Sequence, residues 1–369
     1  MAARRGQVFG KASAVPGFLW PPIVYALVLA LHLAIPVRWT DGYVKDDAGK
    51  PLRYRLNGLY VFLTVVALWA GACFAGVLPW ELFYEKRWEM AASACVLGLV
   101  FTFAVVLPAK PVKGFFADLF LGRVENPQWL GGRVDAKMFL YLVGAIMLEL
   151  NVMSFAAAHL RLHRADPSPG VFLYVGLFSF FVTEYLYFER VHLYTYDFFA
   201  ERVGFKLGWG CFVFYPFFYG VGLWSVAERE NPHTPTALLV VYGLVFFSGW
   251  ALSRGANLQK FHFKISPTKK VFGFLVPSVV EADGKRLLVS GFWGLSRHIN
   301  YLGEILMATG LTLALGHPGY LVPWLYPLYY VALLLPRQAD DDRRCAAKYG
   351  PLWEDYRKRV PYRIIPGIY

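Results

Sequence analysis

The sequence is a succession of long apolar runs separated by short polar segments. A helix rises 1.5 Å per residue, so roughly 20 apolar residues are enough to cross the hydrocarbon layer of a bilayer. Strands of a membrane barrel would instead alternate apolar and polar residues over about ten positions. The pattern therefore predicts transmembrane helices over Gly17–Pro36, Leu59–Trp80, Met90–Ala109, Met138–Ala158, Val171–Phe188, Leu207–Ala227, Ala237–Leu252, Ile299–Leu315 and Tyr320–Leu335.

The aromatic stretch between Phe180 and Gly210 has room for one more span, so we expect nine or ten transmembrane helices. Backbone groups in lipid must find hydrogen bonds within their own segment, which makes the predicted fold all-α and polytopic. The chain has no internal repeat, no low-complexity tract and no long linker, and this favours a single membrane domain over residues 1–369.

Composition agrees with a membrane protein and narrows the function. Only 17% of the residues are charged and 57% are hydrophobic, whereas soluble domains carry about 25% charged residues. The net charge of +12 is concentrated in 38–55, 110–137, 254–297 and the tail after Arg337. Positive loops mark one side of a membrane, so these segments are expected on one face and nucleic-acid binding is not expected. The four cysteines form no CxxC pair, and we expect neither a disulfide framework nor a metal site.

Ionisable residues gather in the aromatic segment Glu184–Gly210. Such residues are costly inside a membrane and usually mark a functional site. Asp197 and Glu201 are four residues apart, so a continuous helix would place them on one face. Aromatic walls raise the pKa of a carboxyl by desolvation, as a proton donor at neutral pH requires. The alternative is an interfacial loop with solvated charges.

A second polar region follows the seventh predicted span, in Arg254–Lys264, Ser290–Glu304 and the tail. A basic belt that binds lipid headgroups would explain the positive charge. It would not require Trp293, Asn300 and Asp341 among the cations. Cations suit phosphates, an acidic residue suits ribose hydroxyls and an aromatic ring suits a base, so the mixture favours a nucleotide. No GxGxxG follows a strand, and the pocket is expected to form from helix ends and loops.

Several of these segments resemble motifs of the sterol reductase family, which includes the sterol C14, C7 and C24 reductases and the transmembrane domain of the lamin B receptor. The run SGFWGLSRHINYLGE at 290–304 resembles the family's SG(W/F)WGxxRHxNYxG(D/E), and the tail from Cys345 to Tyr369 is similar to its ending. Residues 254–260 match RxANxQK, 184–205 follow the family's middle motif, and 120–127 resemble FxGxELNP. The chain departs from the family at Tyr141 and Val143, where the family has Glu and Arg.

The resemblance implies an NADPH-dependent reduction of a sterol double bond, with C14 favoured over C7 or C24. An alkene would be protonated first and then capture hydride. The residues implied for cofactor binding are Lys260, Lys264, Trp293, Arg297, His298, Asn300, Tyr301, Arg337, Asp341 and Tyr349. The implied proton donors are Asp197 and Glu201, followed by Glu184 and Tyr196.

The resemblance also organises the chain: N-terminal helices over 1–115 precede a reductase core over 116–369, with the cofactor pocket in 254–369. The sterol is expected to enter from the bilayer, and no obligate protein partner is evident. The expected location is the endoplasmic reticulum membrane in a eukaryote or the inner membrane in a bacterium.

Two other function classes share part of these features. Isoprenylcysteine carboxyl methyltransferases, which use S-adenosylmethionine, share an RHxxYxG span and an acidic pair, and Asp341-Asp342 is compatible with them. They lack the RxANxQK, GFWG and VPYRIIP segments. A non-catalytic sterol-binding membrane protein is the other alternative. The identity of the bound cofactor would separate the three.

Overall fold

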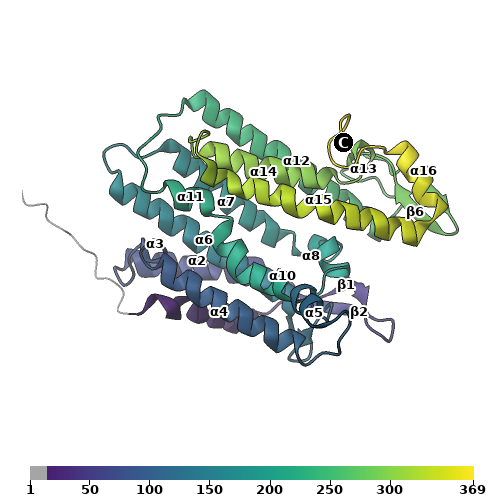
Figure 1. Ribbon diagram of the computed structural model, residues 1–369, viewed down its shortest axis with the longest axis horizontal. Coiled ribbons are helices and arrows are strands. Elements are labelled where there is room, and N and C mark those ends of the chain that lie inside the picture. The colour runs from purple at the N-terminus through teal and green to yellow at the C-terminus, as the bar shows by residue number, and fades with distance from the viewer. Residues whose placement is uncertain (1–14) are drawn as a thin grey trace, which may run out of the picture. The chain divides into compact units, whose positions relative to one another are not determined.

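The structure is a computed structural model that describes residues 15–369, and the chain forms two compact units (Figure 1). Unit 1 takes in the chain up to Pro167 together with Phe178–Asn231, and unit 2 comprises Ser168–Leu177 and Pro232–Tyr369. Helix α7 (Pro169–Tyr187) contributes residues to both units. The prediction of one membrane domain, with a core beginning near residue 116, stays a prediction.

Unit 1 is organised around α6 (Ala136–Leu162), a long helix that is buried over most of its length. Helices α1, α2, α3 and the π-helical segment η2 pack against it. The other elements of the unit are η1 (Gly17–Leu19), α1 (Trp20–Ala34), β1 (Trp39–Lys45), β2 (Pro51–Arg55), α2 (Gly58–Phe74), α3 (Leu82–Glu85), α4 (Arg87–Val106), α5 (Phe115–Leu121), β3 (Gln128–Trp129), β4 (Val134–Asp135), α8 (Glu189–His192), α9 (Tyr196–Phe199), α10 (Phe205–Trp209), η2 (Gly210–Phe218) and α11 (Val221–Val226).

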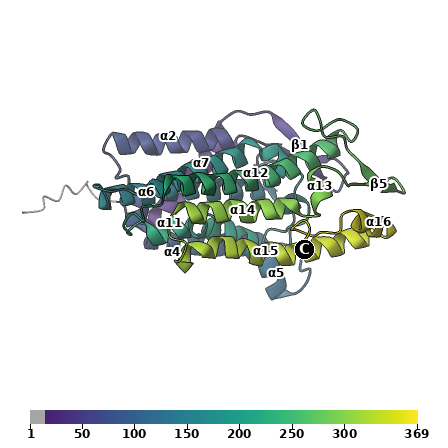
Figure 2. The same cartoon turned by 90° about the horizontal axis from the view of Figure 1, so that it is seen from above.

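Unit 2 contains three long helices that lie side by side, and α14 packs against both α12 and α15 (Figures 1 and 2). Its elements are α12 (Thr236–Ile265), β5 (Val279–Ala282), β6 (Lys285–Leu288), α13 (Phe292–Leu295), α14 (Ile299–Ala314), α15 (Leu321–Tyr349) and α16 (Pro351–Arg359). The β5–β6 hairpin packs on α16 through Val280, Trp353 and Tyr356. The segment after α12 and the tail therefore lie together, as the distribution of positive charge predicts.

Within residues 15–369, six helical segments are long and apolar enough to cross a membrane: Gly17–Ala34, Arg87–Val106, Ala136–Leu162, Pro169–Tyr187, Phe205–Val226 and Thr236–Ile265. The prediction of a polytopic, mainly helical membrane protein is confirmed. Two further predicted spans are shorter apolar helices, α2 with 17 residues and α14 with 16. The last predicted span is the apolar half of α15, a 29-residue helix whose second half is charged.

The additional span considered between Phe180 and Gly210 does not form, because the chain there turns through the two short helices α8 and α9. In the part of the chain that the structure describes, three two-stranded antiparallel sheets are the other difference from an all-α chain. They pair β1 with β2, β3 with β4 and β5 with β6, all in the polar segments between the long helices. Each is a local hairpin, so the sheets leave the helical architecture unchanged.

Small residues allow α12 and α14 to approach each other closely. A Cβ at Gly249 would lie 2.5 Å from the carbonyl oxygen of Gly303, and a Cβ at Gly303 would lie 2.5 Å from the backbone nitrogen of Ser253. The hydroxyl of Ser253 also donates to the Glu304 carboxylate at 2.6 Å. Close backbone approach through small residues is the usual way for membrane helices to associate. This contact fixes the start of α14 against α12.

Gly249→Ala is expected to destabilise the protein by about 1–3 kcal/mol, because the added methyl group overpacks the contact between the two helices. Gly243→Ala is the matched control in the same helix, since a Cβ there would meet no atom within 4 Å. Thermal unfolding of the purified protein in detergent measures both changes. Equal melting temperatures for the two variants would contradict the role assigned to this contact.

Candidate functional site

All the residues predicted to bind the cofactor lie in unit 2, on α12, α13, α14, α15 and the segment between α13 and α14. Hydrogen bonds attach the segment Ser290–Trp293 to α12. The Gln259 side chain donates to the carbonyl oxygen of Ser290 and accepts from the N–H of Phe292, both at 2.9 Å. The indole N–H of Trp293 donates to the carbonyl oxygen of Ala256 at 2.8 Å. Two motifs that are distant in sequence therefore form one structural element.

The face of the Trp293 ring carries a cation. The Lys260 ammonium lies 5.3 Å from the ring centroid, a cation–π distance. Lys264 follows four residues later on α12, so both ammonium groups project from the same side of the helix. This side of α12 thus combines two cations with an aromatic ring, as the nucleotide prediction expected.

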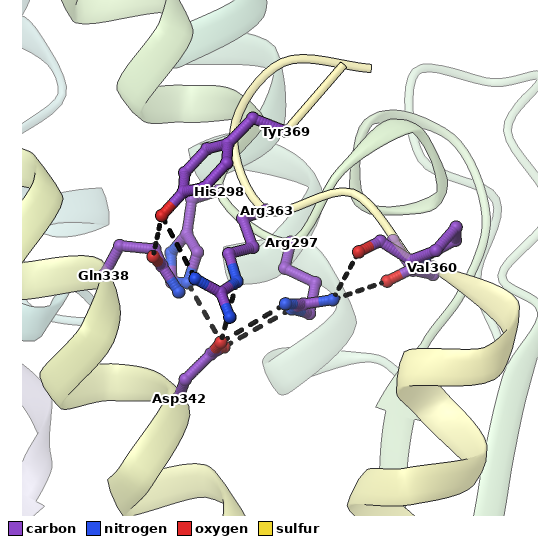
Figure 3. Close-up of polar contacts among 8 residues, drawn as sticks. Arg297, His298, Gln338, Asp342, Val360, Arg363 and Tyr369 are labelled. Atoms are coloured by element: carbon purple, nitrogen blue, oxygen red, sulfur yellow. Dashed lines mark hydrogen bonds and ion pairs between the residues drawn. The ribbon is translucent and has the colours of Figure 1, made fainter. Parts of the chain in front are cut away.

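The Arg297 side chain makes its hydrogen bonds to other parts of the protein (Figure 3). Its guanidinium donates to the Asp342 carboxylate at 3.3 and 3.2 Å and to the carbonyl oxygens of Val360 and Pro361 at 3.0 and 2.8 Å. Its side chain is only 3% exposed. These contacts show that Arg297 holds the tail in place, because its guanidinium N–H groups are directed at protein oxygens. Its prediction as a cofactor ligand has no support in this geometry.

The backbone continues the same attachment. The N–H of Arg297 donates to the carbonyl oxygen of Tyr362 at 2.9 Å, and the N–H of His298 donates to that of Arg363 at 2.8 Å. The hydroxyl of Ser296 donates to the carbonyl oxygen of Ile364 at 2.9 Å. The Ser-Arg-His segment before α14 and the Val-Pro-Tyr-Arg-Ile-Ile segment of the tail therefore run side by side. We call these contacts, with the Arg297–Asp342 pair, the tail latch.

Asp342, the residue after the predicted ribose ligand Asp341, is the acidic member of the latch. Burial of this carboxyl opposes its ionisation, but hydrogen bonding from His298 and the charge and hydrogen bonds of Arg297 outweigh burial and lower the pKa of Asp342. His298 lies 3.9 Å from the carboxylate and stacks on Tyr301 with ring centroids 4.9 Å apart. The latch thus fixes the first turn of α14, where Asn300 and Tyr301 lie.

Asp341 lies on the other side of the same helical turn. Burial first, and then the Asp341 charge, raise the pKa of the Cys345 thiol to about 12, whereas the Lys260 charge opposes the shift. Asp341 and Lys260 therefore both act on one thiol and lie near each other. Arg337, one turn earlier on α15, is half-buried, and Tyr349 at its end stacks on Trp353 with centroids 6.5 Å apart.

These residues fit a dinucleotide phosphate and ribose. The side-chain oxygen of Asn300 is buried and accepts no hydrogen bond from the part of the chain that the structure describes. A buried acceptor of this kind normally has a partner. A ligand hydroxyl would supply one, and the ammonium groups of Lys260 and Lys264 lie in the same unit. The donor set is therefore of the kind that NADPH requires.

The predicted proton donors lie in unit 1, where Lys137 holds their segment in place. The Lys137 side chain is fully buried, and its ammonium donates to the carbonyl oxygens of Asp197 at 2.7 Å, Phe198 at 3.2 Å and Glu201 at 2.7 Å. Asp135 caps the same end of α6 by accepting from the N–H of Met138 at 3.1 Å. The backbone from 197 to 201 is thus fixed on the first turn of α6.

The expected pairing of Asp197 with Glu201 on one helix is wrong. Helix α9 covers only Tyr196–Phe199, and Glu201 follows it in extended chain. The Glu201 carboxylate accepts from the Lys206 ammonium at 2.8 Å, with its side chain 11% exposed. This ion pair engages the Glu201 carboxylate within the protein.

Glu189, an ionisable residue of the same segment that was not among the predicted proton donors, is only 6% exposed. It accepts from the N–H of Gly58, the first residue of α2, at 3.1 Å. Burial raises the pKa of Glu189 to about 8, although the Gly58 hydrogen bond opposes the shift. The first motif position, Glu184, lies near the end of α7 and is half-buried. Glu189 therefore caps the start of α2 and is buried within the protein.

The motif at 120–127 has a structural role beside this segment. The N–H of Val203 donates to the carbonyl oxygen of Val124 at 2.8 Å. Gly122 has a φ of 93°, and a Cβ at Gly204 would collide with the Gly122 backbone. Two chain segments therefore cross in contact, and only glycine fits at the crossing. Lys137 binds the backbone of residues 197–201, and this crossing binds the chain directly after them.

The fold defines an integral membrane protein, and the polar centre of unit 2 combines cations, an aromatic ring and a buried amide. Residues 17–369 match the model of the Ergosterol biosynthesis ERG4/ERG24 family. The chain belongs to this family, as the motifs had indicated.

Three relatives align with nearly all of the chain. The Delta(14)-sterol reductase of Methylotuvimicrobium alcaliphilum is 33% identical over 350 residues, which cover 92% of this chain and 80% of that protein. The Delta(14)-sterol reductase of Arabidopsis thaliana is 31% identical over 96% of this chain and 98% of its own length. The Delta(14)-sterol reductase TM7SF2 of Mus musculus is 33% identical over 100% of this chain and 92% of that protein.

Proposed function

We propose that the chain is an NADPH-dependent sterol reductase that saturates the C14 double bond. The observation that carries the proposal is the near full-length similarity to proteins named Delta(14)-sterol reductase from a bacterium, a plant and a mouse. Neither the methyltransferase nor the non-catalytic alternative has support from these comparisons. The compartment that we propose is the endoplasmic reticulum membrane in a eukaryote and the inner membrane in a bacterium.

The cofactor residues of the proposal are those that unit 2 collects. Lys260, Lys264 and Arg337 hold phosphates, because guanidinium and ammonium groups form charge-assisted hydrogen bonds with them. Asn300 and Asp341 accept from ribose hydroxyls. NADPH supplies a hydride when it is bound. The latch holds α14 and α15 in register, so that residues on both helices reach the same ligand.

The proton donor of the proposal is Asp197, with Tyr196 and Glu184 as further candidates in the same segment. An unpolarised alkene accepts no hydride, so a proton must first reach one of its carbons and leave a cation at the other. An acid that gives a proton in this way must lie within hydrogen-bond reach of the substrate. The sterol that we propose enters from the bilayer into a pocket lined by the segment from Glu184 to Gly210.

The direct test is to incubate the purified protein with NADPH and, separately, with sterols that carry a Δ14, a Δ7 or a Δ24 double bond. We expect NADPH-dependent loss of the Δ14 bond and little change in the other two sterols. Preferential reduction of the Δ7 or Δ24 bond would overturn the assignment of C14. Methyl transfer from S-adenosylmethionine, without any reduction, would overturn the proposal altogether.

Arg337→Ala is expected to weaken NADPH binding by about ten- to a hundredfold, since a charge-assisted hydrogen bond of about 1.5–3 kcal/mol is lost. Arg343→Ala is the matched control: it lies on the same helix, is 76% exposed and pairs with Asp340 at 3.3 Å. Quenching of protein fluorescence by NADPH measures both affinities. A loss of sterol binding with unchanged NADPH affinity would show that the cofactor pocket lies elsewhere.

A further inference from the structure

The tail latch contributes Arg297, Pro361 and Arg363 to the lining of a cavity. The cavity has a volume of about 450 Å³ and is lined by Arg297, Glu354, Arg357, Lys358, Pro361 and Arg363. This volume lies within the roughly 300–1,000 Å³ of small-molecule sites. None of the residues that line it, apart from Arg297, belongs to the predicted cofactor set. The cavity is therefore a separate candidate for ligand binding.

Positive charge dominates the lining. Four of the side chains are cationic and one is a carboxylate, Glu354. Carboxylates outside the lining neutralise part of this charge: Asp342 lies 3.2 Å from Arg297 and 3.9 Å from Arg363, and Asp355 pairs with Lys358 at 3.0 Å. Figure 3 shows both guanidinium groups directed at the single carboxylate of Asp342.

Arg357 remains without a hydrogen bond or an ion pair within the part of the chain that the structure describes. Glu354 lies one turn earlier on α16, but the two form no ion pair within 4 Å. The lining and its neighbours therefore leave about one positive charge unbalanced, together with the guanidinium N–H donors of Arg357.

Cations at the end of α16 also have a simpler effect, since basic residues in a last turn stabilise the helix dipole. That effect is the same for Arg357, Lys358 and the neighbouring Arg359. It does not account for a cavity, which Arg357 and Lys358 line and Arg359 does not. The comparison of Arg357 with Arg359 therefore separates a binding site from helix stabilisation.

We propose that this cavity binds a phosphodiester group, a singly charged anion, through Arg357 with support from Lys358 and Arg363. One negative charge matches the unbalanced positive charge, and guanidinium forks fit phosphate oxygens in bidentate geometry. The site is distinct from the cofactor residues on α12 and α15. It does not depend on the reductase activity proposed above.

Two sources present this chemistry: a phospholipid headgroup and a soluble phosphodiester. Two residues close in sequence to the lining residues have exposed apolar side chains. Leu295 is 46% exposed and Ile368 is 81% exposed. Side chains of this kind suit the acyl region below a headgroup. The two sources differ only in the attached chains, so one experiment with two ligands separates them.

The test titrates the full-length protein, in neutral detergent, with phosphatidylglycerol, phosphatidylcholine and dimethyl phosphate, and counts bound molecules by native mass spectrometry. We expect wild-type protein to prefer phosphatidylglycerol to phosphatidylcholine. Arg357→Gln should weaken phosphatidylglycerol binding by about tenfold, because its charge-assisted hydrogen bonds to phosphate are lost. Arg359→Gln, which removes the same charge two residues further along α16, should change binding by less than about twofold, as an exposed charge does.

Each outcome decides the question. Arg357-dependent binding of phosphatidylglycerol alone supports the site and assigns it to a lipid headgroup. Arg357-dependent binding of dimethyl phosphate as well supports the site and assigns it to any phosphodiester. Equal effects of the two substitutions would overturn the proposal in favour of diffuse charge. A parallel NADPH titration completes the test, since tenfold weaker NADPH binding in Arg357→Gln, with phosphatidylglycerol binding unchanged, would assign the cavity to the cofactor.

Discussion

Replacement of Asp342 by alanine is expected to destabilise the protein by about 3–5 kcal/mol, the cost of leaving a buried charge without its partner. The charge is that of Arg297, whose side chain is 3% exposed and whose partner is 18% exposed. Because the same guanidinium holds the carbonyl oxygens of Val360 and Pro361, the tail should detach with it. Thermal unfolding and the rate of proteolysis within residues 360–369 measure the two effects.

Asp340→Ala is the matched control for this change. Asp340 is on the same helix and pairs with Arg343 and Arg344, but it is 38% exposed, and exposed pairs contribute about 0–1 kcal/mol. Equal destabilisation by the two substitutions would contradict the latch. So would a normal melting temperature in Asp342→Ala, because it would mean that Arg297 finds another partner or needs none.

The latch also has a signature in pH. The folded protein lowers the pKa of Asp342, so the unfolded chain binds a proton to it more readily. The stabilisation is therefore present above the ordinary carboxyl pKa of about 4 and is lost as the pH falls through the lower folded value. Asp342→Asn should remove this part of the acid-induced loss of stability.

The sequence predicted the long helices well, because 20-residue apolar runs have few alternative structures in a membrane. It misplaced structure where the decision depends on tertiary contacts. The segment after Phe188 is aromatic enough for a span, yet the buried Lys137 binds three of its carbonyl oxygens and turns the chain there. No periodicity in the segment itself carries that information.

A local signal for the β5–β6 hairpin was present. Asp283 and Gly284 both have positive φ, 50° and 72°, and Asp-Gly is a preferred pair for a two-residue hairpin turn. The choice between Asp341 and Asp342 had no such signal. Adjacent residues on a helix point about 100° apart, so one faces the latch and the other faces Lys260 only once α14 and α15 are packed.

The sequence motifs also predicted some features of the site correctly and left out those that depend on tertiary contacts. Residue types predicted a nucleotide-binding region, and the structure collects those residues in one unit. The sequence could not separate ligand-binding positions from fastening positions, because Arg297 and Gln259 are as polar as Lys260. Their partners include backbone carbonyl oxygens, which no side-chain pattern encodes. Geometry assigns Arg297 to the tail, a role that its residue type did not predict.

The proton donor gives the prediction with the largest expected change in rate. Asp197→Asn is expected to lower kcat by about 10²–10⁴, the usual contribution of a general acid, while NADPH affinity stays nearly unchanged. Glu201→Gln is expected to have a much smaller effect, because the Glu201 carboxylate is already paired with the Lys206 ammonium at 2.8 Å. Turnover of the Δ14 sterol at saturating NADPH measures both, and Tyr196→Phe and Glu184→Gln complete the series.

An apolar substrate that encloses a carboxyl removes water from it and favours its protonated form, which is how Asp197 would keep a proton to donate. The Lys137 contacts fix the backbone of this residue, so Asp197→Asn should alter the acid without moving the segment. In deuterated water, one solvent deuterium should appear at one of the two reduced carbons, and hydrogen from NADPH should appear at the other. If Asp197→Asn keeps near-normal kcat while Tyr196→Phe loses it, the phenol is the donor, and the carboxylate serves only to orient it.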